Sequence, residues 1–152
     1  MKRLLVFIGL FFLLVSCERD DLCLEKPSVS MNTVFVNSIS GLRESVNLTV
    51  LYEQDTIIAP VTTDSLLIPL PVHEDHFQYV FVNQNGGIAN PDTLVFQYRI
   101  DEQFISKACG FKTVFYDLQI SLIADPDNWI KHVEILESRL TADTLNHVKI
   151  YH

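Results

Sequence analysis

Cys17 is the first cysteine of this sequence, and its thiol could be chemically modified. It follows Leu14, Val15 and Ser16, and these four residues look like a lipobox, the processing site of bacterial lipoproteins. The thiol can take a diacylglyceryl group through a thioether bond, and the small Ser16 gives a peptidase access to the bond before the cysteine. An ordinary signal peptide with an incidental cysteine, or an uncleaved anchor, would also fit. We expect residues 1–16 to be a cleaved signal peptide and Cys17 to carry lipid.

The segment around Cys17 has the composition of an export signal followed by a tether. Lys2 and Arg3 give a positive start, and an apolar run extends from Leu4 to Val15. This run of about twelve residues is too short to cross a bilayer core of about 30 Å as a helix. The charged residues 18–21 resemble the export signal of Bacteroidetes surface lipoproteins, or they are a solvated part of the tether, which we place at residues 17–27.

Cys23 and Cys109 remain once Cys17 is assigned to lipid. An oxidising envelope compartment would pair them, and the bridge would clamp the tether to the folded domain. The chain-entropy model credits a loop of this size with roughly 4–5 kcal/mol as an upper figure. The alternatives are two inert buried thiols, or a reactive Cys109 that folding brings close to a histidine.

Two short polar clusters could bind a metal. His73-Glu74-Asp75-His76 has zinc-type ligands, but it follows two prolines and is more simply a solvated loop. Asp125, Asp127 and Asn128 resemble the start of a calcium loop, yet the glycine and glutamate that should follow are missing. The sequence has no nucleophile elbow, phosphate-binding glycine loop or zinc-protease motif. We expect a protein that is not an enzyme and that uses no metal or cofactor.

Four Asp-Ser/Thr-apolar triplets resemble the O-glycosylation sequon of Bacteroidetes envelopes. Their hydroxyl residues are Thr56, Ser65, Thr93 and Thr144. Glycans there would be bulky, solubilising and confined to exposed loops. The same triplets also begin many strands, because a turn aspartate followed by a β-branched and an apolar residue suits that position. Both interpretations stay open.

The charge of the chain argues against binding to nucleic acid. Without Lys2 and Arg3, nine lysines and arginines stand against 19 acidic residues, a net charge of about −10. Such a surface repels phosphate backbones and anionic headgroups.

The elements that position these residues are predicted to be strands. Apolar side chains alternate with others at 46–52, 77–81, 94–100 and 114–122. Turn residues separate these runs at 53–55, 69–75, 83–87, 90–92 and 125–128. Residues 129–140 suit a helix or a strand, and we favour a strand whose hairpin partner is 147–151. The pattern predicts an all-β chain with one domain over 28–152, an antiparallel β-sandwich of the immunoglobulin-like type.

Three stretches carry a family resemblance: Cys17-Glu-Arg-Asp-Asp-Leu-Cys23, Phe104-Ile-Ser-Lys-Ala-Cys-Gly-Phe-Lys-Thr113 and His147-Val-Lys-Ile-Tyr151. They are similar to an uncharacterised Bacteroidetes lipoprotein family, one labelled a domain of unknown function. The resemblance implies that Cys23 and Cys109 belong to one structural device, and it brings no established activity. It also implies an outer-membrane β-barrel as a partner.

These features predict a lipid-anchored protein of the outer membrane, on its periplasmic face or at the cell surface. We expect a non-catalytic interaction module that contacts a β-barrel or another envelope protein through free strand edges and loops. The alternative is a glycan- or small-nutrient-binding surface lipoprotein. In that case Trp129 could stack on a sugar ring, although a core tryptophan is the commoner situation.

Overall fold

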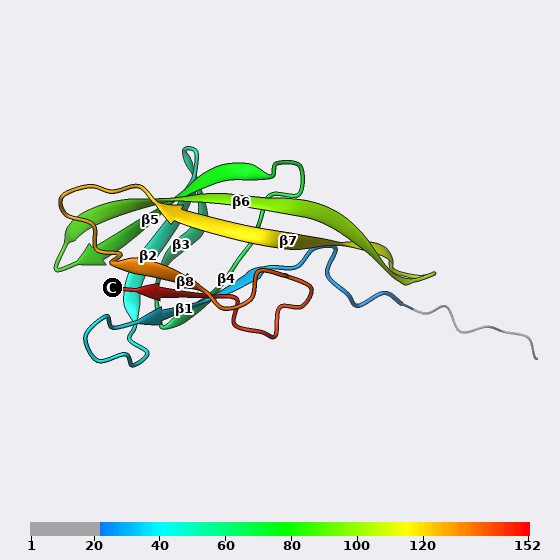
Figure 1. Cartoon of the computed structure of the whole chain (residues 1–152), viewed down its shortest axis with the longest axis horizontal. Helices are drawn as coiled ribbons and strands as arrows, with labels where there is room; N and C mark the ends of the chain where they lie inside the picture. The colour runs from blue at the N-terminus through cyan, green and yellow to red at the C-terminus, as the bar shows by residue number, and fades with distance from the viewer. Residues whose placement is uncertain (1–21) are drawn as a thin grey trace, which may run out of the picture.

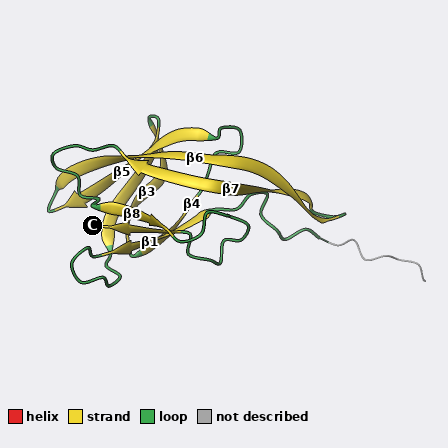
Figure 2. Ribbon diagram, viewed as in Figure 1, coloured by secondary structure: helices red, strands yellow, loops and turns green. Residues whose placement is uncertain are grey.

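The structure is a computed structural model that describes residues 22–152 of the chain. The predicted signal peptide and Cys17 therefore lie outside the described residues. Within them the chain consists of strands and loops, with no helix (Figure 2). Residues 22–152 accordingly include no helix long and apolar enough to cross a membrane.

Nine strands form two sheets that pack face to face, and the predicted all-β sandwich is confirmed (Figure 1). One sheet has the order β3-β2-β5-β6-β7, and the other has the order β4-β1-β9-β8. The strands are β1 (Met31–Val36), β2 (Val46–Tyr52), β3 (Asp55–Thr63), β4 (Ser65–Ile68), β5 (His76–Asn85), β6 (Ile88–Ser106), β7 (Gly110–Leu122), β8 (His132–Ile135) and β9 (Val148–Tyr151).

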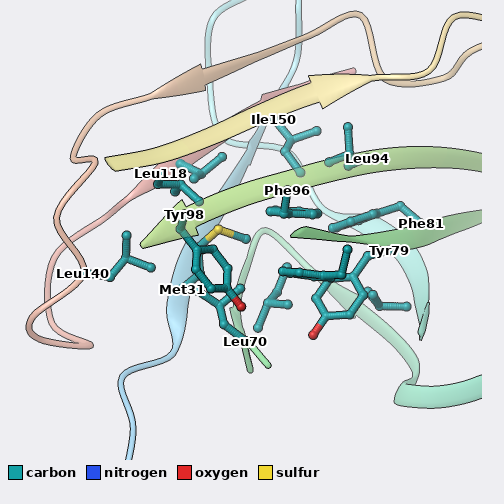
Figure 3. Close-up of a cluster of buried hydrophobic side chains, with 14 of the residues drawn as sticks. Met31, Leu70, Tyr79, Phe81, Leu94, Phe96, Tyr98, Leu118, Leu140 and Ile150 are labelled. Carbon is teal, nitrogen blue, oxygen red and sulfur yellow. The ribbon is translucent and has the colours of Figure 1, made fainter. Parts of the chain in front are cut away.

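The alternating residues that predicted strands supply the core between the sheets. In β5 the buried positions are Phe77, Tyr79 and Phe81, and in β6 they are Leu94, Phe96 and Tyr98. Their rings contact one another, with Phe77 stacked on Phe96 at 5.1 Å between centroids. Figure 3 shows this cluster meeting Met31 of β1 and Ile150 of β9 from the opposite sheet. The period-two pattern thus marks the inward face of each strand.

The predicted strand after Trp129 is confirmed. β8 pairs with β9 in antiparallel register, from His132 opposite Tyr151 to Ile135 opposite Val148. The sandwich is not wholly antiparallel, however, because β9 also pairs with β1 in parallel register. This arrangement places the first and last strands side by side in the four-stranded sheet, and local sequence patterns carry no signal for it.

The strand order also differs from that of immunoglobulin constant domains. In those domains the first and second strands share a sheet. Here β1 and β2 lie in different sheets, and the chain crosses between them through residues 37–45. The sandwich class is therefore right, while the order of its strands is not the immunoglobulin order.

One predicted turn is wrong. Asn90, Pro91 and Asp92 lie inside β6, where Pro91 pairs with Val82 of β5. β7 ends at Leu122, opposite Leu94, so this part of β6 has only one strand neighbour. A proline, which lacks a backbone N–H, is tolerated at such an edge. The preceding turn is also narrower than predicted, because only Gly86 and Gly87, both with positive φ, connect β5 to β6.

Candidate functional site

The longest hairpin of the sandwich projects past the rest of the molecule. β6 and β7 pair from Leu94 opposite Leu122 as far as Ser106 opposite Gly110. The strands of the facing sheet have only four to six residues, so they cannot cover the whole hairpin. Figure 1 shows its far end extending beyond the other strands of both sheets. Gly110 completes the turn with a φ of 67°, a conformation that favours glycine.

A disulfide fastens the segment before β1 to this hairpin. Cys23 and Cys109 are joined, with 4.9 Å between their Cα atoms, as the predicted pairing requires. The backbone continues the attachment: Thr113 N–H donates to the Pro27 carbonyl (2.8 Å), and Val29 N–H donates to the Thr113 carbonyl (3.1 Å). We call Cys23, Cys109 and this backbone ladder the clamp. The direction of the chain before β1 is thereby fixed relative to the hairpin.

Asp143 holds the same segment from its other side. Its carboxylate accepts hydrogen bonds from the Ser30 N–H and the Lys26 Nζ, both at 2.8 Å. Burial raises the pKa of the Asp143 carboxyl, but these hydrogen bonds and the charge of Lys26 outweigh that effect, so the pKa is lowered. Asp143 is therefore ionised at neutral pH and binds the segment before β1 through Lys26 and Ser30.

Apolar side chains remain exposed around the clamp. Phe104 of β6 and Phe111 of β7 face each other across the hairpin, 5.5 Å apart between ring centroids. More than half of the surface of each residue is still exposed, 57% for Phe104 and 61% for Phe111. Leu22 and Leu24, on either side of Cys23, are almost fully exposed. We call these four residues the apolar tip.

A second exposed apolar group lies at the opposite end of the sandwich (Figure 1). In the loop between β1 and β2, which we call the distal loop (37–45), Ile39 is 96% and Leu42 is 70% exposed. Asn37 fixes this loop, because its side-chain oxygen accepts from the Ile39 and Ser40 N–H groups. Backbone bonds from Asn37 to Leu42 and from Gly41 to Asn37 close it. The two apolar side chains are thus presented by an ordered turn.

The four predicted glycosylation residues differ in accessibility. Thr56 and Thr144 are exposed, whereas Ser65 and Thr93 are half-buried within β4 and β6. Asp55 and Ser65 begin β3 and β4, which is the structural role that such triplets often have. O-glycosylation stays a prediction, with Thr56 and Thr144 as its two accessible positions.

The two polar clusters that were considered as metal ligands lie in loops, except for His76, which begins β5. His73, Glu74, Asp75 and His76 are exposed, and Glu74 accepts a hydrogen bond from the Tyr52 hydroxyl. Asp125 and Asn128 close a turn through hydrogen bonds to its own backbone. Among residues 22–152, no three histidine, cysteine or acidic side chains gather in a way that could hold a metal ion.

Two core tyrosines fix the 69–75 loop. The Tyr79 hydroxyl donates to the Pro69 carbonyl (2.7 Å), and the Tyr98 hydroxyl donates to the Pro71 carbonyl (2.6 Å). Burial raises the pKa of both phenols, so they remain protonated donors.

A recess of about 570 Å³ beside the loop opens widely to solvent, and its lining includes His73, Asp75, Tyr98 and Arg99.

Trp129 does not offer a surface for a sugar ring. It is 8% exposed, and its indole N–H donates to the Phe81 carbonyl at 3.1 Å. The core interpretation is therefore right.

Sequence reasoning missed two buried polar residues. Asp92 is fully buried and accepts a hydrogen bond from the Ile130 N–H at 2.7 Å. His147 is fully buried, and its Nδ1 accepts from the Asn32 N–H at 2.9 Å. Both join segments far apart in the sequence, so no local pattern marks them.

The fold and the clamp define this protein as a β-sandwich whose amino-terminal segment is locked by a disulfide to a projecting hairpin. Residues 28–152 match DUF6452, a family of unknown function, and the chain belongs to this family. The predicted membership of an uncharacterised family is thus confirmed. No curated protein and no solved structure matches the chain.

Proposed function

We propose that this protein is a lipid-anchored, non-catalytic interaction module of the bacterial outer membrane. Cys17 carries the lipid, and the β-sandwich contacts an envelope protein, for which the Bacteroidetes family likeness suggests an outer-membrane β-barrel. The mature chain faces the periplasm or the cell surface. The anchor serves attachment, and the folded domain serves recognition.

The distal loop is the observation that carries the recognition part of the proposal. Ile39 and Leu42 are 96% and 70% exposed, although hydrogen bonds to the Asn37 side chain order the loop. An ordered loop loses little conformational entropy when it binds, and its apolar side chains gain from leaving water. Exposed apolar groups of this kind are typical of protein contacts.

The clamp supports the anchoring part. Cys23 follows Cys17 by six residues and is bonded to the hairpin. A lipid anchor at Cys17 would therefore be joined to the domain by a short linker, and Cys23 at the end of this linker is bonded to the hairpin. A disulfide is also the cross-link expected in an oxidising compartment.

Anchoring is tested by mass and fractionation of the parent and the C17A variant. The parent should begin at Cys17 and carry acyl chains, and C17A should leave the membrane fraction. Any further mass on the parent would report glycans, which the variants T56A and T144A should remove. A parent without acyl mass that fractionates like C17A would contradict the anchoring.

Recognition is tested by affinity capture after gentle detergent extraction. The parent should recover an outer-membrane β-barrel protein in an amount comparable to its own. The variant I39S/L42S should recover several-fold less of this protein. L145S, which removes an exposed leucine from another loop, is the matched control and should behave like the parent. Equal recovery by I39S/L42S, or no barrel with the parent, would contradict the proposal.

A further inference from the structure

The apolar tip contains apolar surface that the fold itself leaves uncovered. Phe104 and Phe111 contact each other, yet 57% and 61% of these residues remain exposed. Leu22 and Leu24 add two more exposed apolar side chains beside the disulfide. Mutual packing of the two rings is thus insufficient to explain why four large apolar residues gather at this end.

We propose that the apolar tip inserts into the interfacial region of the membrane that holds the lipid of Cys17. The hairpin would then keep the domain in contact with the bilayer surface. This inference rests on the proposed lipidation of Cys17, and it adds a second membrane contact made by the folded domain. The occupant of the tip is therefore a lipid surface rather than a protein.

The first support is the short reach between anchor and tip. Cys23 lies six positions after Cys17, and a fully extended chain of that length spans at most about 20 Å. The disulfide places Cys23 against Cys109, which lies in the chain between Phe104 and Phe111. The tip is thus the part of the described domain with the shortest covalent path to the bilayer.

The second support is the direction of the hairpin. β6 has 19 residues, with Ile88 at one end and Phe104 near the other. At about 3.3 Å per residue, the strand between these two residues has a contour length of about 50 Å, which is the upper limit of their separation. With the tip at the membrane, the distal loop lies at the end of the sandwich away from the bilayer, where a partner can reach it (Figure 1).

The third support is the kind of side chain at the tip. Phenylalanine and leucine transfer favourably from water into the apolar part of the interface. Lys107 in the turn is exposed and can stay among headgroups with its stem along the apolar surface. Glu18, Asp20 and Asp21 in the tether would be repelled by anionic lipids, so the contact is an apolar one that zwitterionic lipids satisfy.

The test uses tryptophan fluorescence of the full acylated protein in zwitterionic vesicles that contain brominated lipids. F104W and F111W place a reporter in the tip, and I88W places the matched reporter at the other end of β6. The buried Trp129 of the parent supplies the baseline. Intact mass confirms the acyl chains of every sample, and circular dichroism confirms the fold.

Bromines at the upper part of the acyl chains should quench F104W and F111W several-fold more strongly than I88W, and the emission of both tip variants should shift to the blue. If acylated F104W and F111W were quenched no more than I88W, the tip would not touch lipid. This result would overturn the inference and leave the proposed lipid anchor standing. A tip that serves a protein partner would give this same negative result in pure vesicles. A protein without acyl mass would overturn the anchoring and this inference together.

Discussion

Asp92 shows at the residue scale how one carboxylate can connect two distant segments. It is fully buried in β6 and accepts from the Ile130 N–H, 38 residues further along the chain. Burial raises the pKa of its carboxyl, while hydrogen bonding to the Ile130 and Trp129 backbone and to the Asn128 side chain opposes this effect. The carboxylate thus holds the loop that carries Trp129 against the sheet.

We expect D92A to lower the free energy of unfolding by about 1–3 kcal/mol, because the Ile130 N–H would stay buried without an acceptor. Urea unfolding of the purified domain measures the change. The matched control is D127A in the exposed 125–128 turn, which should change stability by less than about 0.5 kcal/mol. Equal effects of the two variants would contradict the role assigned to Asp92.

His147 connects β1 to the β8–β9 hairpin and should make stability depend on pH. Its Nδ1 accepts from the Asn32 N–H, and the backbone N–H of His147 donates to the Asn32 carbonyl. Burial lowers the pKa of the imidazole from its usual value near 6.5. Protonation is therefore easier in the unfolded chain than in the folded one.

The contribution of neutral His147 is fully present above about pH 6.5 and decreases as the pH falls towards the lowered folded pKa. Urea unfolding between pH 5 and 8 should show this loss for the parent, and H147Q should show a flatter profile. An H147Q profile as steep as that of the parent would show that another group is responsible.

Residues with local signals were predictable, and those with only long-range contacts were not. The cysteine pair followed from three cysteines, one of them assigned to lipid, and the Cys23–Cys109 bond confirms it. Asp92 was assigned to a turn because Asn-Pro-Asp favours one locally. Its partner, Ile130, becomes a neighbour only when the strands are assembled.

At the scale of elements, the clamp attaches the segment before β1 to the β6–β7 hairpin. The disulfide closes a separation of 86 residues, and the Lys112–Glu25 pair beside it is an ion pair with one exposed partner. Such an ion pair contributes little beside the disulfide and the backbone ladder of the clamp.

We expect C23S/C109S to lower the free energy of unfolding by about 2–4 kcal/mol, since the unfolded chain loses a long-range restraint. Urea unfolding should show this loss, and the parent treated with a reductant should reach the same stability. A double variant as stable as the oxidised parent would mean that the backbone ladder holds the segment unaided.

Alternation predicted β2 to the residue, but it underestimated β6 and β7. Beyond Ile100 these strands leave the cover of the facing sheet, so exposed residues replace the inward apolar ones up to Phe104. Without a buried face there is no alternation to detect, and the projecting hairpin, with its tip, has no sequence signal of this kind.

At the scale of the whole molecule, the four-stranded sheet depends on its last strand. β9 lies between β1 and β8, and Val148 and Ile150 are fully buried. A chain ending at His147 should therefore lose cooperative urea unfolding and its near-ultraviolet circular dichroism. H152A, which keeps the backbone bonds between His152 and the β1 end, should retain both. Cooperative unfolding of the shortened chain would contradict this dependence.

The parallel pairing of β1 with β9 also sets the order of events during biosynthesis. A polypeptide that emerges amino-terminus first presents β1 long before the strand that must lie beside it. Until then the inner face of the larger sheet is open to solvent and to neighbouring chains. Refolding yield should likewise fall as protein concentration rises, because the apolar inner face can bind neighbouring chains before β9 pairs with β1.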